Sequence, residues 1–139
     1  KNNIAFKTVS SLNMNKFEKY SLKYLQDNKI KIICLAGFMK ILSKKFINAF
    51  KFKIINIHPS LLPKYKGTNT HSKVIKNKDK FTGSTVHYVT EKLDSGKIII
   101  QKKIKINKND TVQKLKKKIL IVEHSLYPKA IIKVLKSNL

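Results

Sequence analysis

The chain has 139 residues, with 31 basic residues against 7 acidic ones, a formal net charge of +24 and one cysteine. This length fits a single domain that buries a core. A lone cysteine excludes an internal disulfide framework and fits a reducing, cytoplasmic compartment. The sequence has no apolar run of bilayer length and no signal-peptide pattern, so no membrane partner is expected.

The basic charge has a compositional explanation. All 31 basic residues are lysine, and asparagine and isoleucine are also abundant. These three amino acids share AT-rich codons, so genome composition accounts for the bias without a ligand. A surface that reads phosphates or bases would be expected to keep arginine for its bidentate geometry. We therefore expect solvated lysine faces and no nucleic-acid partner. A basic nucleic-acid-binding module is kept as the alternative from a different functional class.

The first half of the sequence alternates between strand and helix patterns. Residues 4–9 alternate as a short strand, and a helix capped by Asn13 or Asn15 is predicted to run to about Asp27. One face of this helix is predicted to hold Phe17, Tyr20, Tyr24 and Leu25.

Two apolar runs with the character of buried strands follow. Residues 31–36 form a near-continuous apolar run, as a strand covered on both faces does, and residues 53–57 form another. Between them, Ser43 is placed to cap a short helix that carries Phe46, Ile47 and Phe50. Strands that alternate with helices at this spacing indicate a parallel α/β sheet.

The second half predicts a helix over residues 71–78 and strands over 84–89 and 97–106. The loop between the two strands is short enough for an antiparallel pair. We therefore predict one α/β domain over residues 1–139. Its sheet is expected to be open, doubly wound and mostly parallel, with an antiparallel strand pair near the C-terminal part.

The C-terminal helix carries a start signal and an interruption. Asp110 and Gln113 form a capping box at its beginning. Pro128 is expected either to kink this helix or to start a second one after Tyr127, because proline fits poorly inside a helix.

Two polar residues stand at the end of the strand over residues 53–57. Asn56 and His58 are two residues apart, so their side chains point to the same side of an extended backbone. An amide N–H suits a developing oxyanion, and an imidazole moves protons near neutral pH. Ligands of open α/β sheets bind beyond the carboxyl ends of parallel strands, which favours a site here. A plain strand-end cap is the alternative.

Asp94 is the third candidate, because a carboxylate near His58 would orient the ring and stabilise its protonated form. The alternative is that Asp94 only serves the Asp-Ser-Gly turn in which it lies. The remaining histidines, His71, His87 and His124, are expected to be structural when taken singly. No pair of them has zinc-like spacing, so no metal is predicted.

Taken together, several segments resemble the folate-dependent formyltransferases in order and spacing across almost the whole chain. They are LAGFMKILS at 35–43, NIHPSLLPKY at 56–65 with Gly67, Thr70-His71, GSTVH at 83–87, LDSG at 93–96 and Glu123-His124. Within this family, the pattern is most similar to the phosphoribosylglycinamide formyltransferases of purine biosynthesis.

The resemblance implies an enzyme that transfers a formyl group from 10-formyltetrahydrofolate to the glycine amine of glycinamide ribonucleotide. The implied partners are small molecules, with the folate as co-substrate and no metal. The catalytic Asn, His and Asp of the family fall on Asn56, His58 and Asp94. The residue types suit this chemistry, because amine attack on the formyl carbon builds a negative oxygen and requires proton transfers.

The resemblance also implies two binding surfaces. The folate side comprises Met39, Lys40, Ile41, Leu42, Asn56, Thr90, Glu91, Lys92, Leu93 and Asp94, and the glycinamide ribonucleotide side includes Glu123. Two departures concern these surfaces. Leu120 stands where the family often has a polar residue, and no basic residue matches the folate-contacting arginine that the family often has near Met14.

The largest departure is at the N-terminal side. The family opens with a strand, a phosphate-holding loop and a helix that have no counterpart in this sequence, a unit of roughly 30 residues or more. We therefore expect a chain that lacks the phosphate-binding portion, has an unpaired sheet edge and is inactive alone.

Two related activities are the closest alternatives. Formyltetrahydrofolate deformylase usually has a second histidine where Pro59 stands, and methionyl-tRNA formyltransferase typically has glycine there.

Overall fold

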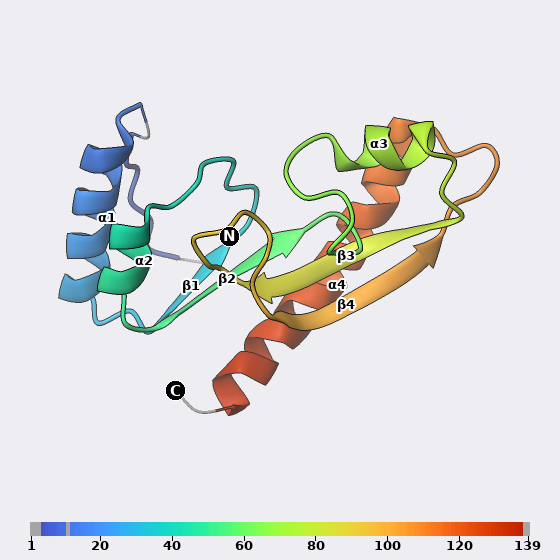
Figure 1. The fold of residues 1–139 in the computed structure, drawn as a ribbon. Helices are drawn as coiled ribbons and strands as arrows, with labels where there is room; N and C mark the ends of the chain where they lie inside the picture. The colour runs from blue at the N-terminus through green and yellow to red at the C-terminus, as the bar shows by residue number, and fades with distance from the viewer. Residues whose placement is uncertain (1–3, 11, 138–139) are drawn as a thin grey trace.

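The computed structural model describes residues 4–10 and 12–137 and contains one mixed four-stranded sheet (Figure 1). The strands lie in chain order: β1 (Ile32–Leu35), β2 (Lys53–His58), β3 (Phe81–Tyr88) and β4 (Ile98–Lys105). β1 and β2 are parallel, whereas β3 runs antiparallel to both β2 and β4. The predicted α/β class, with an antiparallel pair in the C-terminal part, is confirmed.

Four helices accompany the sheet: α1 (Met14–Asp27), α2 (Lys44–Ala49), α3 (Thr70–Lys76) and α4 (Val112–Lys136). Figure 1 shows α4 crossing one face of the sheet, with α1 and α2 side by side next to β1. The main core forms where α4 meets the sheet: Leu126, Ala130 and Val134 pack there against Ile55 and Val86. A second core under α1 and α2 centres on Phe46, Phe50 and Ile54. β2 contributes Ile55 to the first core and Ile54 to the second, so the long loop that follows β2 starts from a well-packed strand.

The helix starts follow the expected chemistry with one exception. Asn13 caps α1 and Ser43 caps α2, each accepting a backbone N–H from the third residue that follows. The cap of α4 is Thr111, not the predicted Asp110. Asp110 instead accepts the Asn107 N–H and forms an ion pair with Lys118 at 2.7 Å. Because its carboxylate is held by these contacts, the next residue supplies the cap.

The face of α1 predicted to hold four apolar and aromatic residues is only partly buried. Phe17 and Leu25 pack into the second core, but Tyr20 and Tyr24 are 63% and 38% exposed. The polar residue Glu18 is buried instead, and its carboxylate accepts the backbone N–H of Ser43 at 2.6 Å and the Ser43 hydroxyl at 2.5 Å. A helical pattern alone does not show that one face of α1 must also anchor the start of α2.

Two strand predictions near the sheet edge need correction. Residues 4–9 form no strand, and Ile4 and Phe6 are 75% and 89% exposed, because this segment has no ladder partner in the described sheet. β1 was expected to be covered on both faces, but it is an edge strand in the described sheet and its Cys34 is exposed. In β4, Ile99 is buried and Ile98 is 42% exposed, as expected for successive residues that point to opposite faces of a strand.

α4 continues through Pro128 as one helix, so no second helix starts after Tyr127. Tyr127 donates its hydroxyl to the Leu35 carbonyl at 2.7 Å and lies 3.3 Å from the Ile55 carbonyl. Packing of α4 on the sheet compensates for the hydrogen bond that proline cannot donate. None of the described helices is both long and apolar enough to cross a membrane.

Candidate active site

The three predicted catalytic side chains come together at the end of β2. Asn56 and His58 lie on the same side of the strand, as their spacing requires, and Asp94 approaches from the loop between β3 and β4. The antiparallel pairing of β2 with β3 places His87 directly opposite Asn56. Four polar side chains from two strands and one loop therefore share one side of the sheet.

Asp94 is the centre of this cluster. Its Oδ2 accepts the Gly67 backbone N–H at 2.8 Å and lies 3.4 Å from His58 Nδ1. Its Oδ1 lies 3.5 Å from His87 Nε2, and the Asp94 side chain is only 8% exposed. Asp94 has a φ of +45°, a left-handed conformation that aspartate tolerates better than most residues. The carboxylate thus both closes the loop at Gly67 and bridges two imidazoles.

His58 has an oxygen next to each ring nitrogen. Its Nδ1 faces Asp94, and its Nε2 lies 2.8 Å from the backbone carbonyl of Tyr65. A neutral imidazole has one N–H and can donate to only one of these oxygens, whereas an imidazolium donates to both. The His58 side chain is 6% exposed, so water does not replace either partner freely. His58 is therefore held between a carboxylate at one ring nitrogen and a backbone carbonyl at the other.

His87 is the site residue that was not predicted. Its Nδ1 lies 2.8 Å from the Tyr88 carbonyl, so Nδ1 carries the proton and Nε2 faces the Asn56 Nδ2 at 3.4 Å. Burial lowers the pKa of His87, although the Tyr88 carbonyl and Asp94 oppose that effect. A neutral His87 leaves its Nε2 lone pair free to accept the Asn56 N–H. His87 thereby orients the Asn56 side chain so that its NH₂ group, and not its carbonyl oxygen, faces the His87 ring.

A narrow cleft of about 60 Å³ opens beside this cluster. One wall comes from the segment after β1, including Lys40, Ile41 and Leu42, and the other from Thr90, Lys92 and Leu93. Asn56, His87 and Asp94 lie at its base. Two predicted residues lie outside the lining: Met39 is 72% exposed, and Glu91 forms an ion pair with Lys44 at 3.4 Å.

Glu123 lies across the sheet from the cleft. Its Oε1 accepts the Ser84 hydroxyl at 3.3 Å, and the same hydroxyl lies 3.0 Å from the His58 carbonyl. Burial raises the pKa of Glu123, and the Ser84 hydrogen bond opposes that effect. Glu123 is therefore joined to the end of β2 through one serine.

His71 lies on α3, and its pKa is lowered by burial and by the positive charges of Lys116 and His58.

Comparison with known proteins identifies the family. The model of the formyl transferase family matches residues 2–131. The chain belongs to the formyl transferase family. It is 45% identical over 105 residues to the phosphoribosylglycinamide formyltransferase of Haemophilus influenzae. It is 43% identical over 107 residues to the human trifunctional purine biosynthetic protein adenosine-3. The crystal structure of the Bacillus halodurans phosphoribosylglycinamide formyltransferase superposes with a TM-score of 0.84 at 37% identity.

These matches cover most of this chain but less of the relatives. The aligned part is 76% of this formyl transferase chain and 50% of the Haemophilus protein, and it is 77% of the chain and 11% of the human protein. The superposition covers 89% of the chain and 64% of the Bacillus structure. The chain therefore spans about half the length of its single-function relative.

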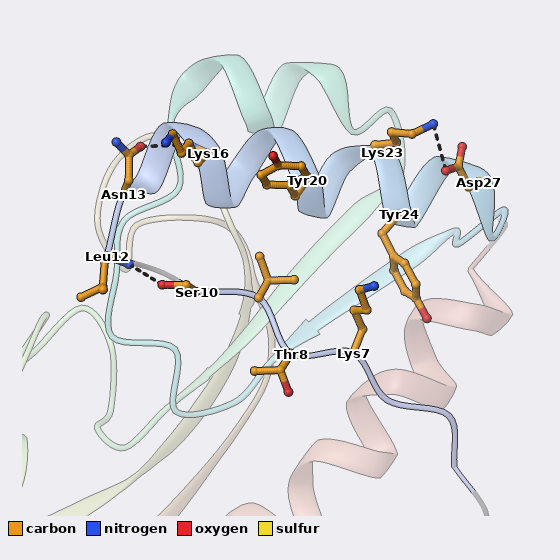
Figure 2. A pocket seen from close by; sticks show the side chains of 11 residues that line it. Lys7, Thr8, Ser10, Leu12, Asn13, Lys16, Tyr20, Lys23, Tyr24 and Asp27 are labelled. Carbon is orange, nitrogen blue, oxygen red and sulfur yellow. Dashed lines mark hydrogen bonds and ion pairs between the residues drawn. The ribbon is translucent and has the colours of Figure 1, made fainter.

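A larger cavity of this formyl transferase chain lies away from the predicted residues. It measures about 490 Å³ between α1 and residues 7–10 (Figure 2). Figure 2 shows Tyr24 of α1 beside Lys7, and an ion pair of Lys23 with Asp27 at 3.2 Å. None of the predicted catalytic residues lines this cavity. Within residues 4–10 and 12–137, no group of three or more His, Cys, Asp or Glu side chains is arranged to hold a metal ion.

Proposed function

We propose that this chain carries the catalytic centre of a phosphoribosylglycinamide formyltransferase, over residues 1–139 as one catalytic domain. The reaction moves the formyl group of 10-formyltetrahydrofolate to the glycine amine of glycinamide ribonucleotide, a one-carbon step of purine biosynthesis in the cytoplasm. The observation that carries the proposal is the cluster of Asn56, His58 and Asp94 beside a cleft: Asp94 Oδ2 lies 3.4 Å from His58 Nδ1, and His87 lies between Asp94 and Asn56.

The first task of the site is to stabilise a negative oxygen. When the amine attacks the formyl carbon, the carbonyl oxygen of the formyl group becomes an oxyanion. The Asn56 amide has two N–H groups: one faces His87 Nε2, and the second is available to the oxyanion. Protonated His58 supplies a second donor when its Nε2–H leaves the Tyr65 carbonyl for the substrate oxygen. Removal of one such donor typically slows catalysis by about 10²–10³-fold.

The second task is proton transfer. The attacking amine loses a proton and the folate nitrogen that leaves must gain one. Asp94 is the general base in this proposal, and its Oδ1 has His87 Nε2 at 3.5 Å. Asp94 takes the proton that the amine loses and then gives it to the folate nitrogen as that nitrogen leaves, directly or through an ordered water. The same carboxylate stabilises the imidazolium form of His58. No covalent intermediate with the protein is formed.

The folate is proposed to enter the cleft between the segment around Lys40, Ile41 and Leu42 and the loop of Thr90, Lys92 and Leu93. Ligand pockets usually measure about 300–1,000 Å³, so a cleft of about 60 Å³ must widen to admit a bicyclic ring. Leu93 is 49% exposed and Ile41 is 64% exposed, so both can move outward at little packing cost. Met39 and Glu91 are proposed to contact only the outer part of the folate.

The amine substrate is proposed to approach from the side of Glu123. This carboxylate is partly buried and has Ser84 as its hydrogen-bond partner, which leaves its other oxygen for a sugar hydroxyl of the ribonucleotide. Glu123 is linked through the Ser84 hydroxyl to the His58 carbonyl, and Asp94 of the folate cleft lies beside the His58 ring, so the two substrates are proposed to meet at His58. This arrangement suits direct transfer.

The test is whether release of tetrahydrofolate depends on the acceptor, glycinamide ribonucleotide. The chain is prepared alone and as a chimera that joins it to the part of the Haemophilus influenzae relative that precedes the aligned region. Each is given 10-formyltetrahydrofolate with and without glycinamide ribonucleotide, and release of tetrahydrofolate is followed. Release by the chimera only when the ribonucleotide is present supports the proposal. Release that is equally fast without an acceptor contradicts it and indicates a deformylase.

A further inference from the structure

A further cavity, which we call the Phe81 cavity, lies beside the loop that follows β2. It measures about 400 Å³ and is bordered by Tyr65, by the loop from α3 to β3, by the first residues of β3 and by Lys103 of β4. Its size falls within the range of small-ligand pockets. None of the residues assigned above to formyl transfer lines it. The cavity is therefore separate from the proposed active site.

The charge of the cavity favours an anion. Lys64, Lys80 and Lys103 line it, against the single carboxylate of Asp79. That carboxylate accepts the Tyr65 hydroxyl at 2.8 Å and lies 4.0 Å from Lys64 Nζ. Lys80 and Lys103 have no carboxylate partner in the part of the chain that the structure describes. Two ammonium groups are thus left to attract a negative ligand.

The cavity also contains an aromatic surface. The Phe81 ring is 42% exposed and carries Lys103 Nζ at 3.9 Å from its centroid. Phe81 and Lys103 lie on the same face of the sheet, because Lys103 pairs with Gly83 and alternate residues of a strand share a face. An apolar ligand body that packs on Phe81 would therefore place its anionic group near the Lys103 ammonium group.

Tyr65 connects this cavity to His58. Its hydroxyl donates to Asp79 and accepts from Asn77 Nδ2 at 2.9 Å, whereas its backbone carbonyl faces His58 Nε2 at 2.8 Å. Its φ is +56°, a left-handed conformation that is rare for a bulky residue and persists only where contacts hold it. A ligand that engages Lys64 or Asp79 changes those contacts. His58 is then freer to leave the Tyr65 carbonyl.

We propose that the Phe81 cavity binds a small organic anion, a phosphate monoester or carboxylate with an aromatic or aliphatic body, and that binding loosens the contact between the Tyr65 carbonyl and His58. The ammonium groups of Lys64, Lys80 and Lys103 hold the anionic group, which draws Lys64 away from Asp79. Leu61, Val74 and Phe81 hold the body. The effect on turnover rests on the proposed role of His58, whereas the binding itself does not.

The binding experiment uses the 139-residue chain and isothermal titration calorimetry with four probes. Phenyl phosphate and benzoate carry both features, inorganic phosphate lacks the body, and benzyl alcohol lacks the charge. We expect phenyl phosphate or benzoate to bind about tenfold or more tightly than the two incomplete probes, because charge and apolar contact each contribute. The stronger of the two shows which anion the site prefers. Equal binding of all four probes, or of none, overturns the proposal.

The variants separate a built site from general attraction to a chain of charge +24. Lys103→Met and Lys80→Met are expected to weaken the preferred probe about fivefold or more, since each removes a charged donor. Lys102→Met is the matched control, because Lys102 is the neighbouring exposed residue of β4 and does not line the cavity. If Lys102→Met weakens binding as much as Lys103→Met, the lysines only place positive charge along the exposed sheet edge, binding reflects that general charge, and the site is refuted.

The coupling is read from the imidazole resonances of His58 and His124 in the same titration. We expect the signals of His58 to shift with the occupancy measured by calorimetry, and those of His124, an exposed residue of α4, to stay in place. Saturating binding without a shift at His58 overturns the coupling. Because neither readout requires formyl transfer, failure of this proposal is distinguishable from failure of the proposed function.

Discussion

Replacement of Asp94 by asparagine should separate chemistry from folding. An asparagine in the same rotamer keeps the contacts of Asp94 Oδ2, because its carbonyl oxygen accepts from the Gly67 N–H and from His58 Nδ1–H. Its Nδ2 takes the place of Oδ1 beside His87 Nε2. Asparagine also tolerates the left-handed backbone at this position. We therefore expect the free energy of unfolding to change by less than about 1 kcal/mol.

The same change removes the negative charge and the proton acceptor. General acid–base catalysis contributes about 10²–10⁴-fold, so turnover of the Asp94→Asn chimera should fall by at least about 10²-fold. Turnover is measured as formylated glycinamide ribonucleotide by mass spectrometry, and stability by urea unfolding of the same preparations. Asp94→Ala is the comparison, because it loses the Gly67 anchor and should cost about 1–3 kcal/mol of stability. Asp94→Asn with full turnover, or with a loss explained by unfolding, would return Asp94 to the role of a turn residue.

Three further changes test other parts of the structure. His58→Ala should lower turnover of the chimera by about 10²-fold or more, and unchanged turnover would remove His58 from the mechanism. The pKa of His87 is lowered by burial, so the unfolded chain binds a proton there more readily and the free energy of unfolding should rise with pH just below 6.5. His87→Gln should flatten that slope by up to about 1.4 kcal/mol per pH unit, and equal slopes in denaturant titrations would contradict this. Glu18→Ala should cost about 1–3 kcal/mol in urea unfolding by leaving Ser43 at the start of α2 without its acceptor, and a cost near zero would show that the contact is dispensable.

Local patterns predicted those parts of the fold that depend on local physics. Ser43 caps α2 and Asn13 caps α1 because cap geometry involves only a few neighbouring residues. Asn56 and His58 are two residues apart in a strand, and this spacing correctly predicted that both lie on one side of the sheet. Asp94 was predicted from its residue type and from the family pattern, and the structure brings it to His58. The catalytic roles of these three residues stay predictions.

The features that were missed depend on contacts between distant segments. His87 looked like a structural strand residue because its neighbours, Asn56 and Asp94, are set by the pairing of β2 with β3 and by the following loop. The strand predicted over residues 4–9 alternates correctly but has no ladder partner in the described sheet. Glu18 is buried in a helix whose apolar spacing predicted a tyrosine face instead. Asn56 is 31 residues from His87 and Ser43 is 25 residues from Glu18, so a local pattern cannot show either contact.

The central claim is that the formyl carbon passes directly to the amine at the Asn56–His58–Asp94 cluster. The most direct measurement follows carbon-13 from labelled 10-formyltetrahydrofolate by NMR, with glycinamide ribonucleotide present and the chimera as catalyst. The label is predicted to appear as the formyl amide of the ribonucleotide, and to do so at least about 10²-fold more slowly in the Asp94→Asn chimera. Label that appears as free formate, or that reaches the amine equally fast without the Asp94 carboxylate, would contradict the mechanism.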